Sequence, residues 1–360
     1  MAEKILMKGN EAIAISAIRN GADGYFGYPI TPQSEVMETL MKERPWLTTG
    51  MIVLQAESET SAINMVYGGA SCGKKIMTSS SSPGISLMCE GISYLAGAEL
   101  PCVIVNCQRG GPGLGTIQAS QSDYTQCVKV GGHGDYNTIV LAPASAQDMY
   151  DHVDIAFELA FKYRTPVIIL ADGIIGQMME KVELRPEKPR MTAEEVKAAA
   201  PWATHGKPAD RAANVTTSLA IESDAHEKFN RKLGAKYQVI KENEVRYETY
   251  MADDAEYLFV AFGCSSRICE AVVDILREEG IKAGLLRPVT LFPFPTDKLA
   301  ELSRNVKSMM SIELNMGQMV NDVRLAVNGR CPVGFYGRQG GNIFTPEEIA
   351  AEFKKFNNMK

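Results

Sequence analysis

Several familiar sequence features are missing from this chain of 360 residues, and each absence excludes a class of site. Its eight cysteines form no C-x-x-C pair and no ferredoxin-type run, so we expect no iron–sulfur cluster or zinc site within the chain. Histidine occurs only four times, at scattered positions, which disfavours a histidine-ligated metal centre. Cysteines without a disulfide scaffold or a secretory signal are typical of reduced thiols, so we expect a cytoplasmic protein.

Features of membrane and nucleic-acid partners are missing as well. No apolar run reaches the length of a transmembrane helix, and the opening segment MAEKILMKGNEAIA has no signal-peptide core. The formal net charge of −6 is opposite in sign to the positive charge with which proteins bind nucleic acid. We expect a globular protein of about two or three domains that binds neither nucleic acid nor membrane.

A dinucleotide-binding fingerprint is also absent. A nucleotide-dependent dehydrogenase would carry G-x-G-x-x-G after its first strand, with an acidic residue about twenty positions further on. The first apolar strand here ends in Tyr-Pro-Ile-Thr-Pro at 28–32, and the segment GGPGLG at 110–115 does not follow a first strand. The sequence therefore disfavours a dehydrogenase of that kind.

Short apolar runs alternate with helical periodicity over the first half of the chain. Continuous apolar runs, in contrast to alternating ones, indicate a parallel sheet covered on both faces. The runs occupy 25–28, 51–54, 75–78, 102–105, 138–141 and 167–170. We therefore predict one doubly wound α/β domain over residues 1–181.

The rest of the chain divides into a connector and a second α/β unit. Residues 182–256 are polar and interrupted by proline, then charge-rich with a helical rhythm, and we predict a connector with some helix. Residues 257–360 again alternate strand and helix patterns, with strands predicted at 257–262, 284–288, 308–314 and 333–336.

Unusual residues follow four strands of the first domain. Ligands of open parallel sheets bind beyond the carboxyl ends of the strands, so these segments should line one crevice. Each residue also has a structural explanation, because Thr31 could cap a helix with Pro32 in its first turn, and acids and serines stabilise helix starts. Their occurrence at successive strand ends favours a binding site. The segments are YPITPQS at 28–34, QAESETSA at 55–62, TSSSSPG at 78–84 and NCQRGGPGLGTIQASQSDY at 106–124.

These segments resemble the α subunit of 2-oxoacid:ferredoxin oxidoreductases, of the type associated with branched-chain 2-oxoacids or 2-oxoglutarate. With GNEAIA at 9–14, INMVYGGASCG at 63–73 and HGDY at 133–136, the resemblance covers the first domain almost continuously. The second unit is similar to the domain that follows in this family. The implied fold is a doubly wound parallel-sheet domain that binds the pyrimidine side of thiamine diphosphate, followed by a transketolase C-terminal-like α/β domain.

The resemblance implies an activity. Such enzymes use thiamine diphosphate to decarboxylate a 2-oxoacid oxidatively, pass the electrons to ferredoxin and release acyl-CoA. We expect this chain to be a subunit of such an enzyme, with 3-methyl-2-oxobutanoate or 2-oxoglutarate as substrate. The alternative is a non-catalytic structural subunit of the same complex, in which loss of the site residues would be expected.

The catalytic and cofactor-binding residues are implied by the same resemblance. Glu59, nine residues before Gly68 on a helix after the second strand, matches the family's catalytic glutamate, whereas Glu57 would be two residues early. A carboxyl group bonded to the aminopyrimidine activates the cofactor. Ser81 and Gly84 are expected to approach the cofactor as well.

The substrate-binding residues are implied to be Thr31 and Arg109. The hydroxyl of Thr31 would point to the substrate, and the guanidinium of Arg109 would bind the carboxylate of the 2-oxoacid. A planar, bidentate donor matches the geometry of a carboxylate.

Half of the cofactor site is missing from the sequence. Thiamine enzymes hold the Mg²⁺-diphosphate with a Gly-Asp-Gly turn and a later asparagine, and the candidate pairs at 23–24, 134–135 and 172–173 do not fit. The resemblance therefore implies that thiamine diphosphate is shared with a β subunit that carries the Mg²⁺. It places the iron–sulfur clusters on ferredoxin-like partner subunits, with a γ-type subunit, ferredoxin and CoA as further partners.

Overall fold

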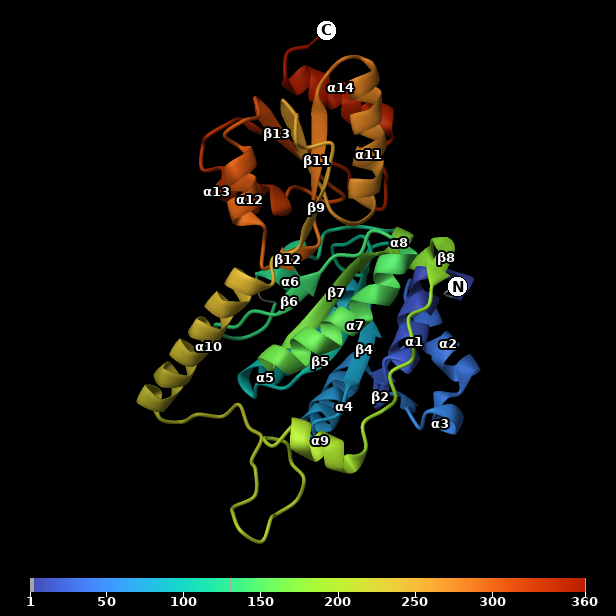
Figure 1. The fold of residues 1–360 in the computed structure, drawn as a ribbon, viewed down its shortest axis with the longest axis vertical. Helices are drawn as coiled ribbons and strands as arrows, with labels where there is room; N and C mark the ends of the chain where they lie inside the picture. The colour runs from blue at the N-terminus through green and yellow to red at the C-terminus, as the bar shows by residue number, and fades with distance from the viewer. Residues whose placement is uncertain (1–2, 130, 360) are drawn as a thin grey trace.

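The chain forms two stacked α/β units in the computed structural model, which describes residues 3–129 and 131–359 (Figure 1). The first unit contains a seven-stranded sheet in the order β12-β6-β7-β5-β4-β2-β3. The second contains a five-stranded sheet in the order β14-β13-β10-β11-β9. The mixed α/β class with parallel sheets is as predicted.

All six strands predicted for the first domain are present, and they pair in parallel. The two central strands β5 and β7 are buried at every residue, which explains their continuous apolar pattern. The strands of this sheet are β2 (Gly24–Gly27), β3 (Ile52–Gln55), β4 (Ile76–Ser80), β5 (Cys102–Gln108), β6 (Ile139–Leu141), β7 (Pro166–Asp172) and β12 (Thr290–Phe292).

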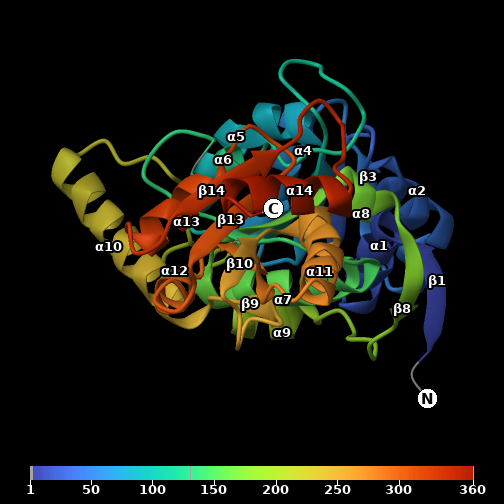
Figure 2. The same cartoon turned by 90° about the horizontal axis from the view of Figure 1, so that it is seen from above.

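Helices cover both faces of the first sheet (Figures 1 and 2). The pair α1 and α7 packs on one face, and the pair α4 and α5 packs on the other. The helices of this unit are α1 (Gly9–Arg19), α2 (Ser34–Glu43), α3 (Pro45–Thr48), α4 (Glu59–Ser71), α5 (Ser82–Gly97), α6 (Tyr124–Val128), α7 (Ala146–Tyr163) and α8 (Gly173–Gln177).

The second sheet contains the four predicted strands and one more. Its strands are β9 (Tyr247–Tyr250), β10 (Tyr257–Val260), β11 (Ala283–Pro288), β13 (Ser308–Glu313) and β14 (Val333–Gly337). Its helices are α11 (Gly263–Glu278), α12 (Thr296–Leu302), α13 (Met319–Val327) and α14 (Pro346–Phe356). The last helix begins with a capping box in which Thr345 and Glu348 bond each other's backbone.

The division of the chain at residues 181 and 256 remains a prediction. Two strands lie on one side of a predicted boundary and pair with a strand on the other side. Strand β9 lies in the predicted connector but pairs with β11, and β12 lies in the predicted second unit but pairs with β6. The connector also holds α9 (Ala193–Ala199) and the largely exposed α10 (Ser223–Asn243). A ribbon of β1 (Lys4–Lys8) and β8 (Met179–Glu183) was not predicted. Over the described residues, no helix combines the length and apolar character needed to cross a bilayer.

Candidate active site

Loops that follow β2, β4 and β5 meet at one edge of the first sheet, as the parallel order requires. The hydroxyl of Tyr25 lies 2.7 Å from that of Ser79, which donates to the side chain of Gln33 at 2.5 Å. The amide of Gln33 in turn donates to the backbone carbonyl of Tyr28 at 3.2 Å. Buried side chains thus tie the end of β4 to the loop after β2.

Glu59 is the first residue of α4, whose N-cap Ser58 accepts a hydrogen bond from the amide of Ser61. Its side chain is 6% exposed, whereas Glu57 lies on the surface. A methyl group on Gly84 would lie 2.7 Å from Oε1 of Glu59, so the backbone of α5 lies directly against this carboxyl group. No described residue hydrogen-bonds the carboxyl group, which leaves it free for a ligand.

Three hydroxyl groups at the end of β4 and the start of α5 are buried without a hydrogen-bond partner among the described residues, and they belong to Thr78, Ser80 and Ser81. Ser81 is the N-cap of α5 but makes no capping bond. Buried polar groups in folded proteins are nearly always satisfied, so orphaned hydroxyls in one place indicate a polar ligand. A methyl group on Gly84 would lie 2.1 Å from the Ser80 hydroxyl, so only glycine keeps this space open.

Arg109 follows β5 and is buried, with 6% of its surface exposed. One terminal nitrogen donates to the carbonyl of Thr31 at 2.9 Å and the other to the carbonyl of Leu114 at 3.2 Å, while Nε has no partner among the described residues. Neither carbonyl neutralises the guanidinium charge, and no described carboxylate forms an ion pair with it. A buried cation of this kind is stabilised by an anionic ligand.

A neighbouring acid lies close to Arg109 without contacting its guanidinium. The hydroxyl of Ser82 donates to Asp123 at 2.6 Å and accepts from the backbone amide of Arg109 at 3.0 Å. Burial raises the pKa of Asp123, and hydrogen bonds from Ser82 and Asn106 with the charge of Arg109 oppose this shift. Ser82 therefore connects the start of α5 to the loop that carries Arg109.

Thr31 lies next to Arg109, but the prediction that it caps a helix is wrong. Helix α2 begins at Ser34 with Gln33 as its N-cap, so Pro32 is not in its first turn. The backbone amide of Gln33 instead closes a turn onto the carbonyl of Ile30 at 3.1 Å. The exposed Thr31 hydroxyl bonds no described residue, and its carbonyl holds Arg109.

The predicted site residues thus form two groups, with Glu59 against Gly84 and Thr31 against Arg109. Residues 81–84 at the start of α5 join them. Sequence reasoning missed the bracing roles of Gln33, Ser79, Asn106 and Asp123, although all four lie in or beside the strand-end segments. The sequence feature that could have indicated these roles is the position of polar side chains at or after strand ends.

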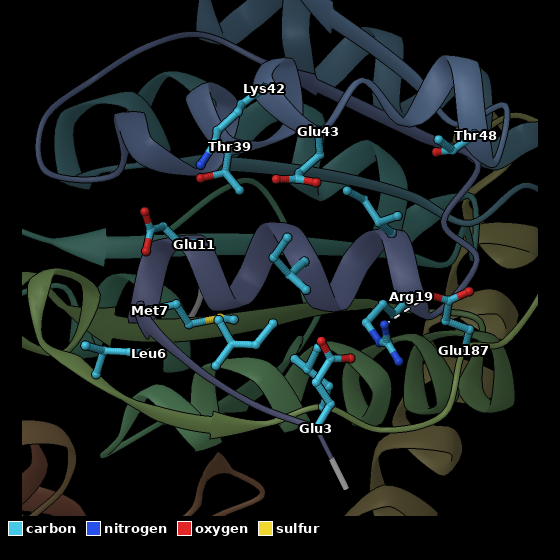
Figure 3. A pocket seen from close by; sticks show the side chains of 14 residues that line it. Glu3, Leu6, Met7, Glu11, Arg19, Thr39, Lys42, Glu43, Thr48 and Glu187 are labelled. Atoms are coloured by element: carbon cyan, nitrogen blue, oxygen red, sulfur yellow. Dashed lines mark hydrogen bonds and ion pairs between the residues drawn. The ribbon is translucent and has the colours of Figure 1, made fainter.

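Two pockets differ in their relation to the predicted site residues, of which Arg109 lines the first. A cleft of about 740 Å³ lies between Arg109 with residues 110–114 of the first unit and Leu314 to Gln318 of the second. Another groove, of about 430 Å³, lies between β1, α1 and α2 (Figure 3), and none of the predicted site residues line it. The cleft at Arg109 is therefore the better candidate for a substrate.

Fold and site together define a class of α/β proteins in which the ends of parallel strands carry an acid, small residues and an arginine. Two family models match the chain. Residues 15–249 match pyruvate flavodoxin/ferredoxin oxidoreductase, thiamine diphosphate-binding, and residues 255–349 match pyruvate:ferredoxin oxidoreductase core domain II. The chain belongs to the family of 2-oxoacid:ferredoxin oxidoreductase subunits.

Named relatives agree with this assignment. The chain is 49% identical to the ketoisovalerate oxidoreductase subunit VorB of Methanothermobacter marburgensis over 97% of both chains. It is 37% identical to the 2-oxoglutarate synthase subunit KorA of Methanocaldococcus jannaschii, over 95% of this chain and 97% of that one.

Solved structures extend the comparison. A 2-oxoglutarate:ferredoxin oxidoreductase from Magnetococcus marinus, with 2-oxoglutarate, coenzyme A and succinyl-CoA bound, superposes with a TM-score of 0.82 at 26% identity. The alignment covers 98% of this chain but only 65% of that longer chain. A split-gene transketolase shares the fold at a TM-score of 0.61 and 16% identity, with 99% of both chains covered.

Proposed function

We propose that this chain is the α subunit of a cytoplasmic 2-oxoacid:ferredoxin oxidoreductase and supplies the pyrimidine half of a thiamine diphosphate site. The observation that carries the proposal is the buried carboxyl group of Glu59, which has no partner among the described residues and lies against Gly84. The orphaned hydroxyls of Ser80 and Ser81 fit a polar ring beside it. These residues therefore suit the cofactor.

The chain's own residues would then act as follows. Thiamine diphosphate, when bound, supplies a carbon nucleophile and an electron sink for decarboxylation. Glu59 would hold a proton at N1′ of the aminopyrimidine. Arg109 would bind the substrate carboxylate while Thr31 donates its hydroxyl, so that the 2-oxo group is oriented before reaction.

The other half of the site would come from partner subunits. No Gly-Asp-Gly turn is present to hold Mg²⁺ and diphosphate, which supports a β subunit in that role. Iron–sulfur clusters would lie on ferredoxin-like subunits beside a γ-type subunit, with CoA and ferredoxin as reaction partners. The isolated chain should then be colourless and inactive.

For the substrate, the lining of the 740 Å³ cleft favours 3-methyl-2-oxobutanoate over 2-oxoglutarate. Arg109 is the one cationic residue among the described residues that line the cleft, and Leu114 and Met316 supply exposed apolar surface. A second carboxylate would require a second cation or donor cluster. The relative at 49% identity, named as a ketoisovalerate oxidoreductase subunit, points in the same direction.

Reconstitution tests this function. The chain is co-expressed with candidate β, γ and cluster-bearing subunits, and CoA-dependent reduction of a viologen dye is measured with a panel of 2-oxoacids. We expect activity only in the full assembly and the highest kcat/KM with 3-methyl-2-oxobutanoate. Full turnover by the partners without this chain would support the structural-subunit alternative, and turnover or cluster absorbance in the isolated chain would contradict the division of labour.

A further inference from the structure

The loop that carries Thr31 is held from two sides by side chains distant in sequence. The carbonyl of Thr31 accepts from Arg109, as described above. The next carbonyl, that of Pro32, accepts from Nδ2 of Asn10 at 2.7 Å and from Nε2 of Gln177 at 3.0 Å. The two consecutive carbonyl groups are therefore fixed by the substrate-side arginine and by a pair of amides on the other side.

Asn10 is rigidly placed. It is fully buried at the start of α1, its Nδ2 also donates to Glu35 at 3.0 Å, and its Oδ1 accepts from the thiol of Cys107 at 3.3 Å. A methyl group on Gly176 of α8 would lie 2.7 Å from Oδ1, so α8 packs closely against this side chain. An amide with every hydrogen-bonding atom used cannot rotate without leaving a buried group unsatisfied.

Glu35 and Lys8 fix the direction of Gln177. The amide of Gln177 donates to Glu35 at 2.8 Å, and Nζ of Lys8 contacts both Glu35 at 3.1 Å and the Gln177 oxygen at 3.0 Å. Burial raises the pKa of Glu35, but hydrogen bonds from Gln177, Lys8 and Asn10 outweigh burial and hold that pKa below its usual value. The carboxylate therefore stays charged and keeps both amides aimed at Pro32.

We infer that Asn10 and Gln177 are positioning residues that hold the Pro32 carbonyl and so keep Thr31 in register with Arg109. This inference rests on the proposed substrate role of Thr31 and Arg109. Both amides donate to the Pro32 carbonyl, one residue after Thr31, so both would act through the loop. Small displacements of a substrate-orienting group lower reaction rates strongly.

Gln177→Met in the reconstituted enzyme is the deciding variant. Gln177 is exposed, so a side chain of similar shape should leave folding unchanged. The variant loses the bonds to Glu35 and Lys8 as well, but the neutral bond to the Pro32 carbonyl is the one that reaches the loop. Loss of that bond should lower kcat/KM for the 2-oxoacid roughly two- to tenfold. We expect the melting temperature and the thiamine diphosphate affinity to stay unchanged, a pattern that a merely structural role would not produce.

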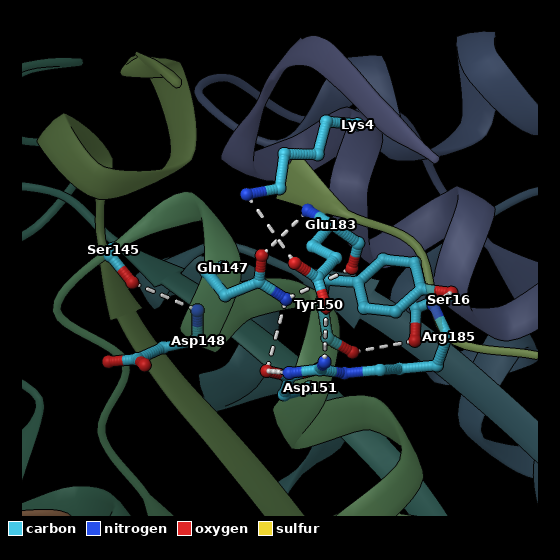
Figure 4. A network of polar contacts seen from close by, with 9 residues as sticks. All are labelled: Lys4, Ser16, Ser145, Gln147, Asp148, Tyr150, Asp151, Glu183 and Arg185. Carbon is cyan, nitrogen blue, oxygen red and sulfur yellow. Dashed lines mark hydrogen bonds and ion pairs between the residues drawn. The ribbon is translucent and has the colours of Figure 1, made fainter. Parts of the chain in front are cut away.

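Gln147→Met is the matched control. Gln147 on α7 also donates to a backbone carbonyl, that of Glu183 at 3.2 Å, and to Asp151 at 3.0 Å (Figure 4). It belongs to a polar network on α7 and β8, outside the candidate site. We expect wild-type kcat/KM from this variant.

A double-mutant cycle with Thr31→Val separates the inference from the proposed function. If Thr31→Val has no effect on kcat/KM, the proposed substrate role of Thr31 fails. If Thr31→Val lowers kcat/KM and Gln177→Met does not, or if the two losses multiply independently, the positioning inference is overturned while the function stands. We expect the effect of Gln177→Met to shrink markedly in the Thr31→Val background, because the displaced hydroxyl is already absent.

Discussion

Replacing Arg109 with methionine separates two roles that one guanidinium can play. The structure gives it a bracing role, through bonds to the carbonyls of Thr31 and Leu114. The proposed function gives it a second role, as the clamp for the substrate carboxylate. Loss of the two hydrogen bonds lowers the free energy of unfolding, and removal of a buried, unneutralised charge raises it. Because the two effects oppose each other, we expect little change in melting temperature.

On catalysis, the effect should be large. Removing one partner of a buried charged pair costs about 2–5 kcal/mol, which corresponds to a fall in kcat/KM of roughly thirtyfold or more at 1.36 kcal/mol per tenfold. The fall should be similar for every 2-oxoacid, because all share the carboxylate that Arg109 binds. Thiamine diphosphate affinity should survive, since Glu59 and the serines of β4 are untouched.

The assay measures melting temperature, thiamine diphosphate affinity and kcat/KM on one preparation of the reconstituted enzyme. Arg164→Met is the matched control, since Arg164 also donates to a backbone carbonyl, that of Glu99 at 3.1 Å, but lies outside the site. An unchanged kcat/KM in Arg109→Met, or a loss confined to one substrate, would refute the clamp. A joint fall in melting temperature and cofactor affinity would instead assign Arg109 to bracing alone.

Two further predictions follow from burial. Gly84→Ala would place a methyl group 2.1 Å from the Ser80 hydroxyl and 2.7 Å from Glu59, so thiamine diphosphate affinity of the complex should fall about tenfold; Gly234→Ala, with nothing within 4 Å, should leave the affinity unchanged. Burial lowers the pKa of His152 from 6.5 to about 4. Between these pH values the unfolded chain binds one proton more than the folded chain. The free energy of unfolding should therefore fall as the pH falls from 6.5 to 4, by about 3 kcal/mol at most. The free energy of unfolding, measured with urea at several pH values, should depend less on pH between 4 and 6.5 in His152→Gln than in the wild type. An identical pH dependence in the two proteins would contradict this prediction.

The strands were predictable because burial leaves a direct pattern in the sequence. Strands β5 and β7 are apolar throughout because both faces of the sheet are covered. By contrast, β12 has three residues and pairs across the two units, and β1 is exposed at its first three positions. Short or exposed strands bury too little surface to impose a pattern.

The segments that meet at the site were predictable, but not the contacts that hold them. Position at a strand end singled out the segments, and the resemblance then implied Glu59, Thr31 and Arg109, whose roles stay predictions. The bonds that fix them join residues far apart, such as Thr31 to Arg109 and Asn10 to Pro32, and periodicity carries no information about such pairs. The alternative in which Thr31 caps a helix is wrong, since Gln33 is the N-cap of α2 and is itself held by contacts with Tyr28 and Ser79.

The central claim is that Glu59 of this chain activates a thiamine diphosphate whose other half is bound by a partner. The most direct test is the rate of hydrogen–deuterium exchange at the C2 carbon of the bound cofactor in the reconstituted complex. Glu59→Gln should fold and assemble normally yet slow this exchange by orders of magnitude, whereas Glu57→Gln, changed at an exposed position two residues earlier, should exchange at nearly the wild-type rate. Wild-type exchange in Glu59→Gln, or a loss found only in Glu57→Gln, would contradict the claim.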